Sequence, residues 1–244
     1  FTDEIIYYSN DPAVVRSMMT KFDDLWTSTT EFEDYANITE PLTRAYPTYP
    51  IDPELNFPPD QSYRSRAVQA YDAEQQKIDV VMFRITDLNH TRAMLRALGR
   101  GIPVRLLTDT EEYRNPKRLW HAYNVDILHH AGAAVRLDAH QGINHAKGVL
   151  LYGSALSIFG SSNWTSPSSD SQREHNYFTT KPFFIQWFTD QFERKWNNET
   201  VNGAAISPLE YVDFVPGFPE TPVNISPAND ALGVGSSVTL RWRA

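Results

Sequence analysis

The chain has 244 residues, a net charge of −8 and no cysteine, with 41% hydrophobic and 21% charged residues. This composition is typical of a folded protein, and it excludes a disulfide scaffold, a cysteine-ligated zinc module and a thiol nucleophile. No apolar run approaches the roughly 20 residues that cross a bilayer, and an acidic chain lacks the broad positive field that attracts nucleic acid or anionic lipid.

Regular elements are predicted from hydrophobic periodicity, and two proline-rich stretches at 41–59 and 208–227 bound a continuous central body. The predicted strands cover residues 4–8, 78–85, 102–109, 133–139, 145–153, 155–160 and 175–180. The predicted helices cover residues 12–26, 65–77, 91–100, 116–130 and 183–197. Alternating strands and helices followed by a hairpin predict an α/β fold with a mixed sheet flanked by helices. We find no internal repeat within the chain.

The stretch from 144 to 178 carries most of the chemical information. His145 and Lys147 lie two residues apart at the start of a predicted strand, so their side chains share one face. The next strand ends in GSSN, where Ser161 and Asn163 are again two apart. If a tight turn pairs these strands, an imidazole, an ammonium, a hydroxyl and a carboxamide converge at adjoining strand ends.

Such a set suits a phosphate group. Lysine and asparagine donate hydrogen bonds to nonbridging oxygens, and histidine attacks phosphorus or carries its proton. Glu174, eleven residues after Asn163, is placed to accept a hydrogen bond from the far imidazole nitrogen and to fix its tautomer. We also expect Ser162 and Trp164 to contact substrate, although packing is the more common role of a tryptophan at a strand end.

HxK followed by GSxN, with RGIPVRLLTD at 100–109, resembles the phospholipase D superfamily over about residues 65–200. The resemblance implies a phosphodiesterase that needs no metal or cofactor and in which two such motifs face each other. One histidine forms a phosphohistidine and the other protonates the leaving oxygen. The resemblance then makes His145 the motif histidine, Lys147 the phosphate-binding lysine, Ser161 and Asn163 the GSxN pair, and Glu174 the histidine-orienting carboxylate.

Two features depart from the family pattern. Tyr152 stands where the family has an aspartate five residues after the lysine, a residue that usually makes structural hydrogen bonds near the turn. In addition, HxK and GSxN each occur only once, so one chain supplies half of a two-motif site. His140 and His145 could be read as metal ligands, but no third ligand stands at a usable spacing.

The first 35 residues suggest where the other half belongs. They resemble the strand and helix that close a phospholipase-D-like half, and they parallel residues 175–196 in order and aromatic spacing. We therefore expect that the chain, which begins at Phe1, is the C-terminal lobe of a two-lobed enzyme; the alternative is a symmetric dimer of single-motif chains. The expected domains are a remnant of a preceding lobe (1–36), a Pro-rich linker (37–62), a phospholipase-D-like domain (63–200), a second linker (201–219) and the start of a fibronectin/Ig-like module (220–244).

The expected activity is hydrolysis or transfer of a phospholipid phosphodiester. A nuclease on the same scaffold is the first alternative, and the net charge of −8 argues against it. A lobe that only binds a phosphate-containing ligand is the second. Because a sandwich-like tail after a hydrolase is commoner in exported bacterial proteins, we expect an extracellular or periplasmic location.

Overall fold

The computed structural model describes residues 2–28, 48–217, 223–226 and 241–243. It separates the chain into two compact units, Phe1–Asp213 and Phe214–Ala244. The smaller unit contains one antiparallel pair, β11 (Val223–Ser226) with β12 (Arg241–Arg243). Apart from this pair, the expected start of a fibronectin/Ig-like module at 220–244 lies outside the described residues.

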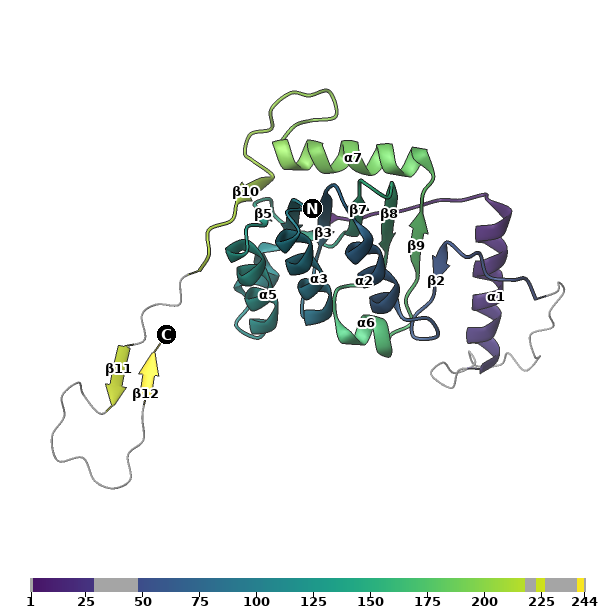
Figure 1. Ribbon diagram of the computed structural model, residues 1–244, viewed down its shortest axis with the longest axis horizontal. Coiled ribbons are helices and arrows are strands. Elements are labelled where there is room, and N and C mark those ends of the chain that lie inside the picture. The colour runs from purple at the N-terminus through teal and green to yellow at the C-terminus, as the bar shows by residue number, and fades with distance from the viewer. Residues whose placement is uncertain (1, 29–47, 218–222, 227–240, 244) are drawn as a thin grey trace, which may run out of the picture. The chain divides into compact units, whose positions relative to one another are not determined.

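A mixed sheet of eight strands forms the centre of the larger unit (Figure 1), in the order β10-β5-β4-β3-β7-β8-β9-β2. The strands are β2 (Leu55–Asn56), β3 (Ile78–Met82), β4 (Val104–Thr108), β5 (Ala134–Asp138), β7 (Lys147–Leu151), β8 (Leu156–Gly160), β9 (Asn176–Thr179) and β10 (Tyr211–Asp213). Strands β3, β4 and β5 are parallel, and all other neighbours in the sheet are antiparallel. The predicted mixed α/β fold is confirmed.

Helices connect these strands and flank the sheet. They are α1 (Pro12–Ser28), α2 (Tyr63–Ala73), α3 (Leu88–Gly99), α4 (Thr110–Arg114), α5 (Leu119–His130), α6 (Ser166–Asp170) and α7 (Pro182–Asn197). Several begin at side chains that satisfy free backbone N–H groups: Asp87 caps α3 through the amide of Asn89, and Asp109 caps α4 through the amide of Glu112.

Both faces of the sheet are covered. On one face, Leu107 of β4 packs with Phe192 of α7, and Arg105 bridges Asp79 of β3 to Glu193 of α7. Because side chains alternate along a strand, the residues between these point to the opposite face, where α3 packs on β4 and α5 on β5. Figure 1 shows α7 on one side of the strands and α2, α3 and α5 on the other.

Three of the differences from the predicted elements involve strands. Residues 4–8, predicted as a strand, form no regular element, because pairing stops after β1 (Thr2–Asp3), whose partner β6 (Ile143–Asn144) ends where the chain turns into β7. The two expected linkers also contribute strands: β2 pairs with β9, and β10 pairs with β5. These strands add to the two edges of the sheet.

Candidate active site

The motif residues meet at one end of the central strands of the sheet. His145 lies just before β7 and Asn163 just after β8, and these strands are antiparallel neighbours with Gly148 opposite Phe159. On the side of β7 away from β8, β3 runs antiparallel to β7, so the residues that follow β3 reach the same end of the sheet. This end of the sheet is where the parallel strands have their carboxyl ends, and open α/β sheets bind their ligands there.

His145 holds one ring nitrogen against a carboxylate. Its Nδ1 lies 2.8 Å from Oε2 of Glu4, and its ring meets Phe83 edge to face with centroids 5.0 Å apart. The side chain is 39% exposed. Because a carboxylate accepts the Nδ1 hydrogen, the neutral ring carries its lone pair on Nε2. Nε2 is therefore the nucleophilic atom that this arrangement provides.

The carboxylate beside His145 differs from the expected one. We expected Glu174 to orient the ring, but Oε1 of Glu174 accepts a hydrogen bond from Ser168 Oγ over 2.9 Å. Glu4 takes the position instead, carried there by the segment between β1 and α1. The sequence held one signal for Glu4, since it stands in the part of the chain that parallels the residues after GSSN.

Lys147 is only 4% exposed, and its ammonium donates to the backbone carbonyl of His145 and lies 5.3 Å from the centroid of the Phe83 ring. Burial lowers the pKa of Lys147 to about 8, even though Glu4 and Glu174 oppose this effect. The ammonium is thus charged at neutral pH but poorly hydrated, which strengthens its interaction with an anion.

The GSSN segment is fixed by its neighbour β9. A Cβ at Gly160 would collide with the backbone of His175 and Asn176, so only glycine fits this close approach. Ser161 Oγ accepts the His175 amide at 3.0 Å, and Ser162 Oγ accepts from Asn176 Nδ2 at 2.8 Å. Both serines therefore hold the loop in place, and Ser162 is 1% exposed.

Asn163 and Trp164 point to different surroundings. Asn163 Oδ1 accepts a hydrogen bond from the backbone N–H of Arg84 at 3.3 Å. This leaves the Nδ2 group of Asn163 as a hydrogen-bond donor for another partner. Trp164 is fully buried and stacks on His90 with centroids 5.1 Å apart. The expected contact of Trp164 with substrate is therefore corrected: the indole packs in the core, because its backbone pairs with Ile85 and draws the ring inward.

Arg84 is a residue of the site that the sequence did not single out. It follows β3, and its guanidinium pairs with both oxygens of Glu112 at 2.7 and 2.8 Å. Glu112 lies in α4, which follows β4. The segments after β3 and β4 therefore carry opposite charges at the same end of the sheet. The signal was a charged residue within four residues of the end of each of two buried strands, a pattern too common to identify a site by itself.

Tyr152, at the family's aspartate position, is compatible with an ordered turn. Its hydroxyl donates to Asp79 Oδ2 at 2.7 Å. The carboxylate that binds the turn between β7 and β8 comes from Glu74, which accepts from the amides of Gly153 at 2.7 Å and Ser154 at 3.2 Å. Glu74 also accepts from the two amides that follow it in the chain.

We expect Glu74→Gln to lower the free energy of unfolding by about 2–3 kcal/mol, because a buried amide cannot accept all of these hydrogen bonds. Although burial opposes it, the backbone N–H groups hold the pKa of Glu74 below the usual 4.5. The stabilisation is therefore present above about pH 4.5 and is lost as the pH falls through the lower folded-state pKa. Urea unfolding at pH 7 and pH 3 checks this.

Asp72→Asn provides the control, because Asp72 of α2 pairs with Arg96 of α3 at the exposed surface, and its replacement should change stability by less than about 1 kcal/mol. Equal effects of the two substitutions at pH 7 would contradict the role of Glu74.

The described residues show neither a metal cluster nor a membrane-spanning helix. No three His, Asp or Glu side chains among them are arranged to hold a metal ion, and His140 instead lies 3.2 Å from Asp3. None of the described helices is both long and apolar enough to cross a bilayer.

The mixed sheet gathers a histidine, a lysine and an asparagine where β7 begins and β8 ends, beside the carboxyl ends of the parallel strands. Residues 68–196, more than half of the chain, match the family model of the PLD-like domain of cardiolipin synthase. The chain therefore belongs to the phospholipase D superfamily, a family of phosphodiesterases.

Curated relatives agree with this assignment. The human protein named mitochondrial cardiolipin hydrolase is 27% identical over 189 residues, covering 76% of this chain and 70% of the relative. The mouse protein of the same name is 27% identical, covering 68% of this chain and 73% of the relative. Among solved structures, the phospholipase D family member Nuc from Salmonella typhimurium has a TM-score of 0.55 at 18% identity, covering 66% of this chain and 95% of that chain, which shows the shared fold.

These relatives correct the expected location. The extracellular or periplasmic location was inferred from the tail alone, whereas the similar proteins from human, mouse and dog are all named mitochondrial. The expectation was therefore wrong, and the relatives give no support to a secreted bacterial protein. A fragment of a tail module was too weak a basis for inferring a compartment.

Proposed function

We propose that the protein hydrolyses or transfers the phosphodiester of a phospholipid through a phosphohistidine formed on His145. The observation that carries this proposal is the 2.8 Å contact of His145 Nδ1 with Glu4, which leaves the Nε2 lone pair free on a partly exposed ring whose backbone carbonyl binds the buried Lys147 ammonium. A nucleophile, an orienting carboxylate and a cation are the parts that covalent phosphoryl transfer requires.

The proposed reaction has two steps, formation and breakdown of the phosphohistidine. The Nε2 lone pair of His145 attacks phosphorus, the P–N bond forms, and the bond to the leaving alcohol oxygen breaks while a second acid protonates that oxygen. Lys147 and the amide of Asn163 stabilise the negative charge on the nonbridging oxygens. Water or an alcohol then attacks phosphorus, loses its proton to the same group, and releases the imidazole. In the family that second group is another histidine of an HxK motif, and this sequence contains one such motif.

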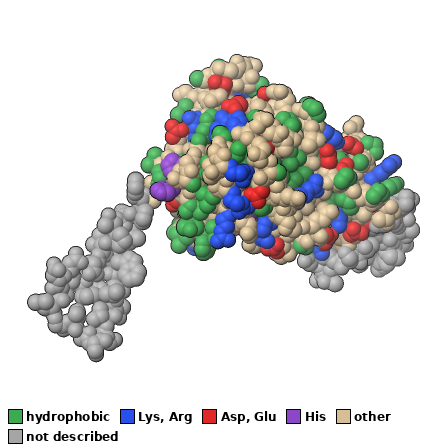
Figure 2. All heavy atoms as spheres, viewed as in Figure 1, with side chains coloured by type: hydrophobic (Ala, Val, Ile, Leu, Met, Phe, Trp, Pro, Cys, Tyr) green, Lys and Arg blue, Asp and Glu red, His purple; other side chains and the backbone are tan. Residues whose placement is uncertain are grey.

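Surface charge supports a lipid over a nucleic acid. Figure 2 shows Lys and Arg side chains gathered over α2 and α3, and two of the arginines on these helices pair with nearby acids. Arg64 pairs with Asp87 and Asp170, and Arg96 pairs with Asp72. Paired cations release few counterions from a nucleic acid backbone. The names of the relatives, which are cardiolipin hydrolases, also favour a phospholipid.

The test is an assay of the protein expressed from its full coding sequence against cardiolipin or phosphatidylcholine vesicles and, in parallel, against plasmid DNA. We expect release of lipid products and an acid-labile phosphoryl group on His145 after rapid quenching. Plasmid cleavage without lipid turnover would transfer the proposal to the nuclease alternative. Turnover of neither substrate would favour a lobe that only binds phosphate. Added primary alcohol separates transfer from hydrolysis, because only transfer yields a new phosphodiester.

A further inference from the structure

Asp3 is a buried carboxylate that directly precedes Glu4 in the chain. It is 9% exposed, and three side chains from distant segments donate to it. Its Oδ1 lies 2.7 Å from Nζ of Lys195. Its Oδ2 accepts from the hydroxyl of Tyr211 and lies 3.2 Å from Nε2 of His140. We call these four residues the Asp3 cluster. An ionised carboxylate has about four acceptor sites, so one carboxylate can accept from all three donors.

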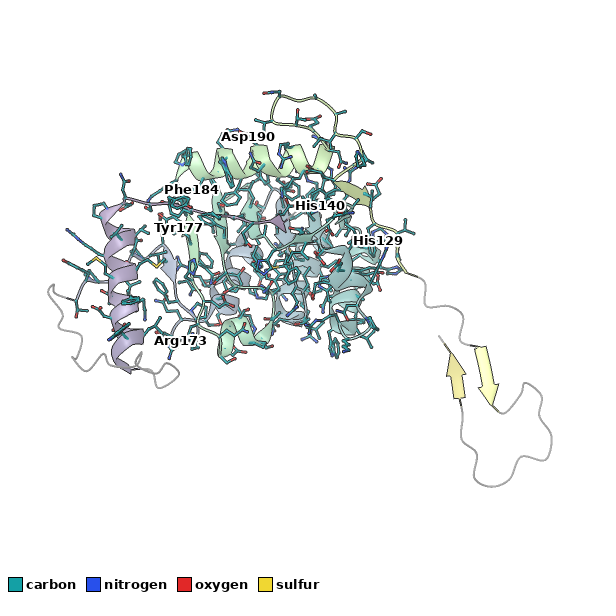
Figure 3. The ribbon with its side chains drawn as sticks, turned by 180° about the vertical axis from the view of Figure 1, so that it is seen from behind. His129, His140, Arg173, Tyr177, Phe184 and Asp190 are labelled. Carbon is teal, nitrogen blue, oxygen red and sulfur yellow. The ribbon has the colours of Figure 1, made fainter. Side chains whose placement is uncertain are left out.

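The three donors of the Asp3 cluster come from elements that are anchored elsewhere in the fold. Lys195 lies in α7, which packs on the sheet through Phe192. Tyr211 is fully buried in β10, which pairs with β5, and His140 follows β5 by two residues. Figure 3 shows His140 below α7, near β1. The position of Asp3 is therefore set by parts of the molecule that do not depend on β1.

The pairing of β1 with β6 is too short to fix its own register. The described ladder consists of two residue pairs, and the second joins Asp3 to Asn144. The next position in this register sets Glu4 opposite His145, where the two side chains meet at 2.8 Å. A slip by one residue would turn the side chain of Glu4 to the other face of the strand. The contact with His145 thus depends on whatever holds the register of β1.

We propose that Asp3 is a positioning residue of the active site: through the Asp3 cluster it holds the register of β1 and so keeps Glu4 on Nδ1 of His145. Asp3 acts through Glu4 and is not itself a catalytic residue. The proposal rests on the proposed function only for its effect on rate, because the tautomer of His145 is observable without turnover.

The charge of Asp3 favours this role. Burial by itself would raise the pKa of Asp3, but the nearby Lys195 ammonium and the hydrogen bonds of the cluster hold it below the usual 3.8. The carboxylate is therefore ionised at neutral pH and can accept from all three donors. An asparagine in its place would accept through one oxygen only, and its NH2 group would face a donor.

The first test measures the tautomer of His145 in Asp3→Asn, using the protein expressed from its full coding sequence with 15N-labelled histidine. At about pH 8.5 a free imidazole is neutral, and ring 15N NMR distinguishes a protonated nitrogen from an unprotonated one. The signals that disappear in His145→Ala identify the ring. In the wild type we expect Nδ1 to be protonated. In Asp3→Asn we expect the signal of this tautomer to fall by at least about half, because Glu4 no longer stays at Nδ1.

Two further variants make the test specific. Asp190→Asn is the matched control, because Asp190 is exposed on the outer side of α7, where it accepts from Gln186, and it should leave the tautomer unchanged. Tyr211→Phe removes one donor of the Asp3 cluster without changing a charge, and it should shift the tautomer in the same direction as Asp3→Asn but less. If urea unfolding shows that Asp3→Asn does not fold, Tyr211→Phe carries the test.

The second test shows whether Asp3 acts through Glu4. We expect Asp3→Asn to lower kcat about tenfold and to change KM by less than about twofold, because the groups that bind the phosphoryl oxygens stay in place. In a Glu4→Gln background the same substitution should cause no further loss, since the side chain that Asp3 positions is already replaced.

Three results would overturn the proposal. The first is a wild-type tautomer of His145 in folded Asp3→Asn, or in Tyr211→Phe if Asp3→Asn is unfolded. The second is an equal shift in Asp190→Asn. The third is a double variant whose loss of kcat is the product of the two single losses, which would mean that Asp3 acts independently of Glu4. If the protein turns over no phosphodiester, the proposed function fails, and the tautomer measurement still decides the role of Asp3.

Discussion

Replacing His145 with alanine is expected to reduce phosphodiester turnover by at least about 10³-fold, because the reaction loses its covalent intermediate. The structure gives the reason: the Glu4 contact at Nδ1 leaves the Nε2 lone pair of this partly exposed ring free to attack. Steady-state kcat/KM with cardiolipin vesicles measures the loss. Rapid quenching should show no acid-labile phosphoryl group on the variant.

Two further variants separate chemistry from structure. His130→Ala, at the exposed end of α5, should leave kcat/KM unchanged, since this ring lies outside the site. Glu4→Gln should lower kcat more than it raises KM, by about 10- to 100-fold, because an amide in that place no longer selects the tautomer with a free Nε2. If the His145 variant retained wild-type turnover, the assignment of the nucleophile would be wrong.

Replacing Lys147 with methionine is expected to lower kcat/KM by about 10²- to 10³-fold, because the variant keeps the buried volume but loses the cation that meets the phosphoryl oxygens. The wild-type profile should fall as the pH rises through about 8, where the free enzyme loses the charge on this buried ammonium. The pH profile of kcat/KM reports the free enzyme, so it should contain this alkaline limb. In the enzyme–substrate complex the bound phosphate stabilises the charged form of Lys147, so the alkaline limb of the kcat profile should move to higher pH.

Lys117→Met is the matched control, because Lys117 is an exposed lysine in the loop before α5. It should leave both the rate and the alkaline limb unchanged. A limb near pH 8 that persists in the Lys147 variant would show that another group titrates there.

Local sequence predicted most of the fold because each element carries its own signal. The apolar run at 78–82 forms β3, and the spacing from Pro12 to Trp26 forms α1, as hydrophobic periodicity indicated. The short edge strands β2 and β10 could not be predicted in this way. Each has two or three residues, and its extended form depends on a partner strand far away in the sequence.

The candidate site was predictable where its residues share a strand end. His145 precedes β7, Lys147 begins it and Asn163 follows β8, so one hairpin joins them. Glu4 was not predictable as the partner of His145, because 141 residues separate them and only the tertiary fold brings them together. Spacing alone gave Glu174 that role, although its carboxylate bonds to Ser168.

By itself, the sequence determined the motif, the family resemblance and the order of strands and helices, since these depend on residue types at short spacing. The tertiary structure alone decided which carboxylate holds His145, that Trp164 is a core residue, and that Glu74 binds the turn beside Tyr152. It also showed that α1 exposes the apolar side chains of Met18, Phe22 and Trp26. These are contacts between distant segments, and their energies depend on burial and geometry, which no local pattern of residues specifies.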